Sequence, residues 1–516
     1  MTFTLPECRT RPIPLIGAAA IIAILGASLP TQSIAETLTI AASSAPTTLD
    51  PTLSANGLPS VWYPNLAYAS LIRRAPDGTA QPGLALDWAY SEDRLSFVMN
   101  LREGVKFSDG TDLTAEGVVE WLERYKEKGQ FTAWLANVSK IEASGPFQVT
   151  LTLSTLDPML PYGLDQGGMA GAVVSPGGLA DPDKLGTATF GAGPYMIDSE
   201  RTIIESQYVY VKNPHYWNPD AQYWDEVVIK VIPDGNAVLS SLRTGQVQVA
   251  EGQATDAEAA EAAGLKIFSA PSAMVGVYLG DIGGNIVPAL ADVRVRQALN
   301  FAIDRAGIAA ALYGEYGAPT TQFVPDGIGG YVAELERFYS YDAEKAKALL
   351  AEAGYPDGFS FDLLLQPAVP GGDLLGQAMA ANWQAVGVDV TLKPSEGFST
   401  YVPMYFSGDY PATTLTFQYS VQLTDTQQLV TSDAVYNFSK FVDEKADSLA
   451  VEQRKYDIDT PEGVAAAEAS ERYMVENAFL VPVASVDALI FASDDVTGLD
   501  FTTYPWPDPS NWKPVE

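Results

Sequence analysis

The side chains that could carry chemistry are almost all carboxylates. The 516-residue chain has 64 Asp and Glu against 30 Lys and Arg, with one histidine, His215, and one cysteine, Cys8. A zinc site needs several imidazoles or thiolates, and a hydrolytic triad needs a histidine beside a placed nucleophile. None of the patterns GxxxxGK[ST], GxGxxG and GxSxG occurs. The sequence therefore predicts no catalytic residue, no metal site and no cofactor.

Two features leave a chemical alternative open. His215 lies between the dipeptides Asn213-Pro214 and Asn218-Pro219, where a turn or surface histidine is the favoured interpretation. The many acids guarantee chance carboxylate pairs, whereas a glycosidase needs two carboxyl groups about 5 to 10 Å apart across a cleft. Sequence spacing cannot show such a pair, so a secreted carboxylate-dependent hydrolase remains the alternative function.

The formal net charge of −34 excludes several partners. A nucleic-acid reader needs a basic face, and no run of basic residues is longer than the pair Arg73-Arg74. We therefore expect no nucleic-acid binding. The excess of carboxylate would also repel an anionic membrane surface.

Residues 1–35 are predicted to be an export signal that is cleaved after Ala35. Arg9 and Arg11 precede an apolar stretch over residues 13–29, and small residues follow at Ser33 and Ala35. The alternative, an uncleaved membrane anchor, fits less well because Pro14, Gly17 and Gly26 interrupt the stretch. We expect a periplasmic protein with no stable membrane insertion after signal cleavage. It would contain no disulfide, because Cys8 lies inside the signal.

The body of the chain has the pattern of a mixed α and β protein. Strands are predicted over residues 38–41, 96–101, 149–153, 227–232 and 388–392. Thr114, Asp292 and Asp342 are placed to cap three amphipathic helices, the last of which should end at Gly354. Four Pro-Asp-Gly tripeptides, beginning at residues 76, 233, 325 and 356, are interpreted as tight turns.

Six phrases, taken in order, resemble those of the extracellular solute-binding proteins of bacterial ABC importers, specifically the large peptide, dipeptide and nickel type (family 5). Each phrase alone consists mostly of residues that form turns and helix caps. All six phrases in the family's order are a specific indication of the family. They are the opening segment 39–51 with Thr48-Leu49-Asp50-Pro51, the segment 97–114 reading FVMNLREGVKFSDGTDLT, Gly191-Ala192-Gly193-Pro194-Tyr195, Asn213-Pro214-His215-Tyr216-Trp217, the segment 292–305, and the segment 346–358.

The resemblance implies an α/β, periplasmic binding protein-like fold with two lobes joined by a hinge, in the family's three-subdomain (class C) architecture. On this basis residues 36–71, 190–280 and 488–516 would form the core domain of the first lobe, residues 72–189 its extra subdomain, and residues 281–487 the second lobe. Ligand contacts to both lobes would favour a closed form through their differential affinity. No chemical step is required, so we expect a protein that is not an enzyme.

The resemblance also implies the function and the ligand contacts. The protein would be the substrate-binding component of an ABC importer, a monomer that captures a small organic solute, a peptide or peptide-like compound, in an interlobe cleft and delivers it to the permease subunits. In peptide-binding members a loop after the opening Leu-Asp-Pro contributes contacts, and a later Trp-x-x-Asp segment supplies an Asp for the α-ammonium. The corresponding residues here are Asn56, Gly57, Leu58, Tyr419, Ser420, Gln422 and Asp425.

Gln422 departs from the family pattern, because it occupies the position of the ammonium-binding Asp. An amide supplies no counter-charge, so sugars or opine-type solutes are an alternative to unmodified peptides. Other interpretations of these residues also stay open: turn chemistry for Asn56 and Asp425, core packing for Tyr419, and a solvated polar side chain for Gln422.

Overall fold

The computed structural model describes residues 36–516, except residues 56, 328, 368, 419–428, 433, 435, 459, 500, 502–506 and 516. The predicted export signal thus lies outside the described residues. Within them, no helix has the length and hydropathy of a membrane span.

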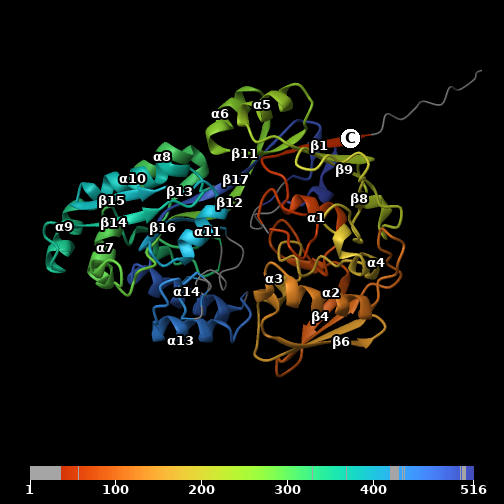
Figure 1. Cartoon of the computed structure of the whole chain (residues 1–516), viewed down its shortest axis with the longest axis horizontal. Helices are drawn as coiled ribbons and strands as arrows, with labels where there is room; N and C mark the ends of the chain where they lie inside the picture. Colours follow the sequence, from red (N-terminus) through yellow and green to blue (C-terminus); the bar gives the residue numbers. More distant parts are fainter. Residues whose placement is uncertain are drawn as a thin grey trace, which may run out of the picture. The chain divides into compact units, whose positions relative to one another are not determined.

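A large mixed sheet organises the fold, with the strand order β15-β14-β16-β12-β17-β11-β1-β10-β9-β8 and with β13 paired to β17 (Figure 1). Its strands are β1 (Thr37–Ala42), β8 (Tyr195–Ile197), β9 (Gln207–Lys212), β10 (Glu226–Val231), β11 (Val249–Gly252), β12 (Lys266–Tyr278), β13 (Gly317–Pro319), β14 (Phe359–Leu364), β15 (Val388–Lys393), β16 (Ala412–Gln418) and β17 (Leu480–Ala492).

The remaining strands form smaller sheets. They are the hairpin of β2 (Ile72–Arg74) and β3 (Ala80–Pro82), the pair β18 (Val496–Thr497) and β19 (Lys513–Pro514), and a sheet of order β4-β5-β7-β6 made of β4 (Ala85–Tyr90), β5 (Ser96–Leu101), β6 (Val138–Gly145) and β7 (Gln148–Leu153).

The described α-helices are α1 (Trp62–Ala67), α2 (Ala115–Lys128), α3 (Leu160–Gly163), α4 (Pro176–Ala180), α5 (Gly235–Arg243), α6 (Ala257–Ala262), α7 (Val293–Phe301), α8 (Arg305–Tyr313), α9 (Ala343–Glu352), α10 (Gly372–Gln384), α11 (Phe398–Phe406), α13 (Glu444–Gln453) and α14 (Pro461–Glu476). The three predicted caps are confirmed, since Thr114, Asp292 and Asp342 accept backbone N–H groups at the starts of α2, α7 and α9.

Three of the four predicted Pro-Asp-Gly turns have a glycine with positive φ: Gly78, Gly327 and Gly358, at 82°, 89° and 76°. The fourth prediction was wrong. Asp234 caps α5 by accepting the backbone N–H of Ala237, and Gly235 is the first residue of that helix. An Asp in a turn and an Asp at a helix start both bond backbone N–H groups two or three residues on, so the tripeptide alone does not separate them.

Two 13-residue strands, β12 and β17, pair along their whole length and contribute to four hydrophobic cores. The first core gathers residues between 38 and 270 and between 490 and 512. The second and third cores lie within residues 273–486, and the fourth joins Ala41 and β11 to α5 and α6. The two strands therefore connect the first core to the second and third, with register shifts in the ladder between Pro271 and Ala273 and between Val275 and Gly276.

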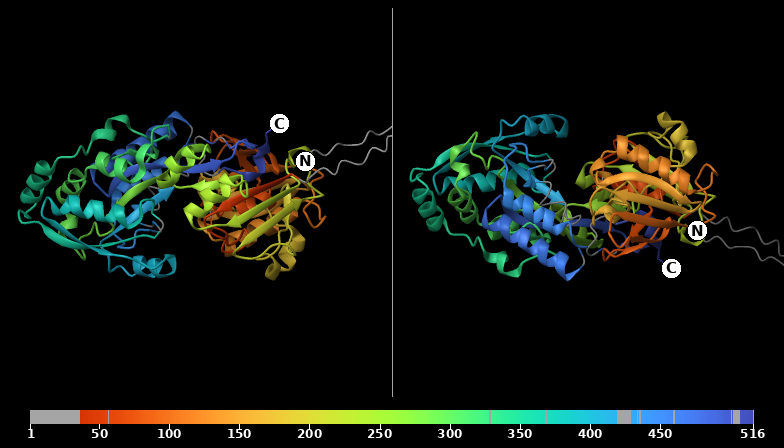
Figure 2. Two further views of the ribbon diagram at one scale, coloured as in Figure 1. Left: turned by 90° about the horizontal axis from the view of Figure 1, so that it is seen from above. Right: turned by 90° about the horizontal axis from the view of Figure 1, so that it is seen from below.

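The second and third cores lie on opposite faces of the sheet. Val275 and Val277 of β12 belong to the second core, whereas Met274 and Tyr278 belong to the third, as the two-residue period of a strand requires. Helices α7, α9 and α10 pack on the second core, and α13 and α14 contribute to the third. The two views of Figure 2 show helices on both faces of this part of the sheet.

The first core joins segments that are far apart in the sequence. The rings of Trp62 and Trp512 meet edge to face, with 5.6 Å between their centroids. The indole N–H of Trp224 donates to the carbonyl of Trp512 at 2.9 Å, and that of Trp62 donates to the carbonyl of Pro507 at 3.0 Å. A large buried indole needs a partner for its N–H, and here the C-terminal segment supplies it.

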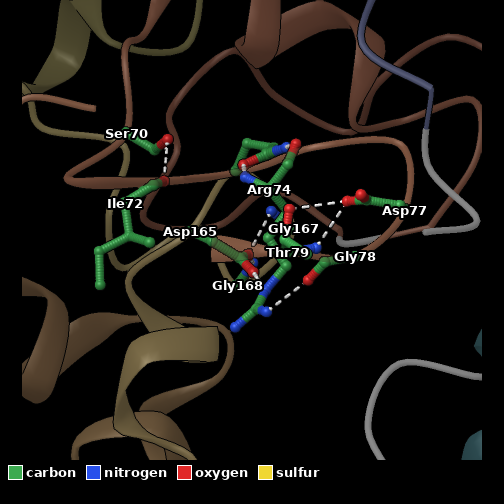
Figure 3. Close-up of polar contacts among 10 residues, drawn as sticks. Ser70, Ile72, Arg74, Asp77, Gly78, Thr79, Asp165, Gly167 and Gly168 are labelled. Atoms are coloured by element: carbon green, nitrogen blue, oxygen red, sulfur yellow. Dashed lines mark hydrogen bonds and ion pairs between the residues drawn. The ribbon is translucent and has the colours of Figure 1, made fainter. Parts of the chain in front are cut away.

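A buried ion pair fixes the hairpin of β2 and β3. The guanidinium of Arg74 donates to Asp165 at 2.7 Å and to the carbonyl of Gly78 at 2.9 Å (Figure 3). Asp165 also accepts the backbone N–H groups of Gly167 and Gly168. Both charged side chains are at most 5% exposed, and the guanidinium lies 3.4 Å from the ring centroid of Tyr162. The pair thus has the additional hydrogen bonds that a buried charge needs.

Glu471 of α14 gives the fold a predicted dependence on pH. The side chain is buried, accepts the backbone N–H of Phe323 at 2.5 Å, and burial raises the pKa of its carboxyl from 4.5 to about 7. The folded state therefore binds this proton more tightly than the unfolded chain. The corresponding free energy of unfolding, about 3 kcal/mol, is present in full below about pH 4.5 and is lost as the pH rises to about 7.

Denaturant unfolding across this pH range measures the effect. In Glu471→Gln, which is neutral throughout, we expect a smaller decline of unfolding free energy with rising pH than in the unchanged protein. Glu468→Gln, an exposed position on the same helix, is the matched control and should leave the decline intact. Equal pH slopes for the unchanged protein and Glu471→Gln would contradict the prediction.

Candidate functional site

The loop that follows β1 contains the opening Leu-Asp-Pro of the family pattern. Asp50 is buried, accepts the backbone N–H of Thr52 at 2.9 Å, and pairs with Arg124 of α2 at 3.2 Å. The carbonyl of Thr52 accepts the backbone N–H of Gln130 at 2.7 Å. Asp50 thus holds the middle of the loop on α2 and leaves the two ends of the loop to meet other strands.

The start of the loop lies at a topological switch point of the sheet. Strand β1 is parallel to β10 on one side and to β11 on the other. After β1 the next strands of this sheet lie on the side of β10, whereas after β11 the chain continues to β12 on the side of β17. In open α/β sheets, ligands bind outside the carboxyl ends of strands at such a point.

At this switch point Ser43 and Glu251 join the carboxyl ends of the two strands. The hydroxyl of Ser43, directly after β1, donates to the carboxylate of Glu251 in β11 at 2.5 Å. Glu251 is opposite Ile490 of β17, so its side chain is on the face that carries the first core. The phenol of Tyr63 in α1 donates to the carbonyl of Ser44 at 2.8 Å and closes the same corner.

The environment of Glu251 combines partial exposure with loss of hydration. The residue is neither fully buried nor fully exposed. Even so, burial raises the pKa of its carboxyl, and the hydrogen bonds from Ser43 only partly oppose that shift. The charge of Glu251 also contributes to the raised pKa of Tyr63, after burial and the neighbouring Tyr208.

The far end of the loop contacts β16, which is separated from β1 by β11, β17 and β12 in the strand order. A Cβ atom on Gly57 would lie 3.2 Å from the side-chain oxygen of Gln418, the last residue of β16. Gly57 is half-buried, and Leu58 packs against the first core. The loop therefore extends from the switch point to the end of β16, directly before the second predicted contact segment.

The other predicted contact residues lie outside the described residues. These are Asn56, Tyr419, Ser420, Gln422 and Asp425. Their roles, and that of Gly57 and Leu58 toward a ligand, stay predictions.

A second contact joins the two sides of the molecule away from the switch point. Ile458, between α13 and α14, packs against the buried Met159, as do Trp134 and Tyr162. Beside it Asp457 forms an ion pair with Arg94. Because this ion pair is partly exposed, the apolar packing of Ile458 is the more stabilising part of the contact.

His215 is an exposed turn residue, in agreement with the interpretation from the sequence. Its backbone N–H donates to the side chain of Asn213, which also donates to the carbonyl of Gly193. Trp217 stacks under the guanidinium of Arg102, 4.1 Å from the ring centroid. This phrase of the family pattern therefore stabilises a turn. Within the described part of the chain, no group of three or more His, Cys, Asp or Glu is placed to hold a metal.

Comparison with known proteins decides the family. Residues 79–432 match the model of the bacterial extracellular solute-binding proteins, family 5 Middle. The chain belongs to this family. Solved structures of periplasmic binding proteins have the same fold as this family 5 protein, which confirms the predicted fold class.

Relatives of this family 5 protein bind different solutes. The glutathione-binding protein GsiB of Escherichia coli (strain K12) is 32% identical over 339 residues, which are 64% of this chain and 64% of that relative. The match thus spans less than two thirds of the relative. AgaA from A. tumefacien R10, in complex with agropinic acid, is 25% identical with a TM-score of 0.78 over 93% of this chain and 99% of that one.

A further structure shows the fold alone. The periplasmic binding protein DppA from Helicobacter pylori, in complex with the peptide STSA, has a TM-score of 0.79 and 20% identity, over 93% of this chain and 98% of that one.

Glu251 and Ser43 were absent from the residues predicted from the sequence. The usable signal was weak: an acid at the end of the short apolar strand Val249–Gly252, and serines directly after Thr37–Ala42. Only the strand order shows that these two ends are adjacent.

Proposed function

We propose that the chain is the substrate-binding component of an ABC importer. It is exported to the periplasm, captures a small organic solute between its two lobes, and delivers that solute to the permease subunits. The solute is a peptide or a peptide-like compound. The function needs reversible closure around the ligand and no chemical step.

The single observation that carries this proposal is the path of the loop after β1. The loop begins at Ser43 beside Glu251, at the carboxyl ends of β1 and β11, and reaches Gln418 of β16 through Gly57. A solute bound along this loop would contact residues near β1 and β11 and residues near β16 at the same time. Such a solute stabilises the form in which these two sets of residues are close together, because it gains contacts there that the open form lacks.

A ligand screen tests the proposal. Thermal unfolding is followed with glutathione, di- to tetrapeptides, agropinic acid and sugars, the solute classes suggested by the relatives and by the sequence. A ligand at about 100 times its Kd should stabilise the protein by about 2.7 kcal/mol, and X-ray scattering should show a smaller radius of gyration. Mass spectrometry should detect the bound solute unchanged, whereas a hydrolase would convert the solute to products. No stabilisation by any class, together with unchanged scattering, would contradict the proposal.

The sequence-based role of Gln422 is tested with Gln422→Asp. We expect the substitution to shift preference toward ligands with a free ammonium by about tenfold, because a carboxylate is restored at the position where the family has one. Calorimetry with a free and an N-acetylated dipeptide measures the preference. If the unchanged protein already strongly prefers the free amine and Asp425→Asn removes that preference, Asp425 is the anchor and the role given to Gln422 is wrong.

A further inference from the structure

We propose that Glu251 is the anionic anchor for a primary ammonium group of the bound solute, with Ser43 holding its carboxylate in place. The inference rests on the proposed function and deepens it, because it names the chemical class of the ligand: small organic solutes that carry a protonated amine.

The first argument is position. Glu251 and Ser43 stand at the carboxyl ends of two adjacent parallel strands, at the switch point of the sheet. The loop that begins at Ser43 is the one that reaches Gln418. Glu251 therefore lies at one end of the path along which a solute would contact residues near β1 and β11 and residues near β16.

The second argument concerns the charge of the Glu251 carboxylate. In the part of the chain that the structure describes, no lysine or arginine pairs with Glu251. Dehydrating a carboxylate without a cation is costly, and in a chain of net charge −34 the surrounding field adds to that cost. The raised pKa of the group has the same cause. A cation brought by the ligand would remove this penalty only in the bound state.

The third argument selects the kind of cation. The hydroxyl of Ser43 already donates to Oε2 of Glu251, so a ligand cation that needed both carboxylate oxygens would compete with this hydrogen bond. A guanidinium is best matched by both oxygens of a carboxylate, whereas an ammonium is a compact point charge that one oxygen can bind. The geometry therefore favours a primary ammonium over a guanidinium.

Calorimetry with paired probes tests the proposal on the chain of residues 36–516. Each pair is an amine and its N-acetylated form: alanyl-alanine, glutathione and lysine, with a neutral disaccharide and agropinic acid as probes outside the pairs. We expect at least one amine to bind and its acetylated form to bind about 10- to 100-fold more weakly. In Glu251→Gln the amine should lose about the same factor, and its acetylated partner should change little.

Asp487→Asn is the matched control. Asp487 is in β17, is also partly exposed, and burial also raises the pKa of its carboxyl. It is opposite Pro271 and on the other face of the sheet from Glu251. If the general negative field attracts amines, Asp487→Asn and Glu251→Gln will weaken the amine equally, and the proposal is overturned.

The remaining outcomes separate this inference from the proposed function. If solutes bind but Glu251→Gln weakens the amine and its acetylated form equally, Glu251 has a structural role, and only the anchor proposal fails. The same holds if the disaccharide or agropinic acid binds and no amine does. If no probe binds and no other solute stabilises the protein, both the proposed function and the anchor proposal fail.

Discussion

Arg305→Met is expected to lower the free energy of unfolding by at least about 4 kcal/mol. The guanidinium of Arg305 is buried, and burial lowers its pKa to about 9. It donates to the carbonyls of Thr320, Pro482, Asn300 and Tyr339 and to the side chain of Asn300, at 2.7 to 3.1 Å. Methionine fills similar volume but leaves these oxygens without a donor, and each unsatisfied group costs about 1 to 3 kcal/mol.

Denaturant unfolding measures this loss, and a conservative variant identifies its cause. Arg305→Lys keeps the charge but not the planar fork, so we expect an intermediate loss of about 2 kcal/mol. If the hydrogen bonds were unimportant, the Arg305→Met variant would be as stable as the Arg305→Lys variant or more stable, because methionine avoids burying a charge. That order of stabilities would show that the prediction is wrong.

Asp165→Ala is expected to destabilise the protein by about 3 to 5 kcal/mol, because it leaves Arg74 buried without its counter-charge. It also removes the acceptor for the backbone N–H groups of Gly167 and Gly168. Asp165→Asn keeps an oxygen for those groups and loses only the charge, so its effect should be smaller. Thermal or denaturant unfolding provides the comparison.

An exposed ion pair is the control for this prediction. Lys140 and Glu142 are 2.7 Å apart, but their side chains are 62% and 43% exposed. Glu142→Gln should change stability by less than about 1 kcal/mol, since surface pairs contribute little. Equal effects of Asp165→Ala and Glu142→Gln would mean that burial of the Arg74 pair adds nothing.

Local signals were sufficient for many elements but not for the strands that join the cores. Caps such as Thr114 and Asp342 act within three residues, so the sequence contains the whole interaction. The strands β12 and β17 were not predicted. They are buried on both faces over long stretches and contain Pro271, Gly276 and Pro482, so they lack the two-residue alternation that identifies a strand.

The same distinction separates the family from its ligand. Several phrases that carry the resemblance perform structural roles: Asp50 holds a loop on α2, Asn213 forms a turn, and Arg305 joins five oxygens. These roles stabilise the fold and say nothing of the solute. Glu251 could not be predicted, because its meaning depends on the adjacency of β1 and β11, 208 residues apart at the Ser43–Glu251 bond.

The composition of the first core has a consequence for the order of events during synthesis. Its residues end at Ala270 on one side and resume at Ile490, 220 positions later. At about 5 to 20 residues per second, a ribosome needs on the order of 10 to 40 s to make that interval. During this time Trp62 and Trp224 have no Pro507 or Trp512 carbonyl to bind. The apolar surface of the first core therefore stays incomplete until the last strands have been made.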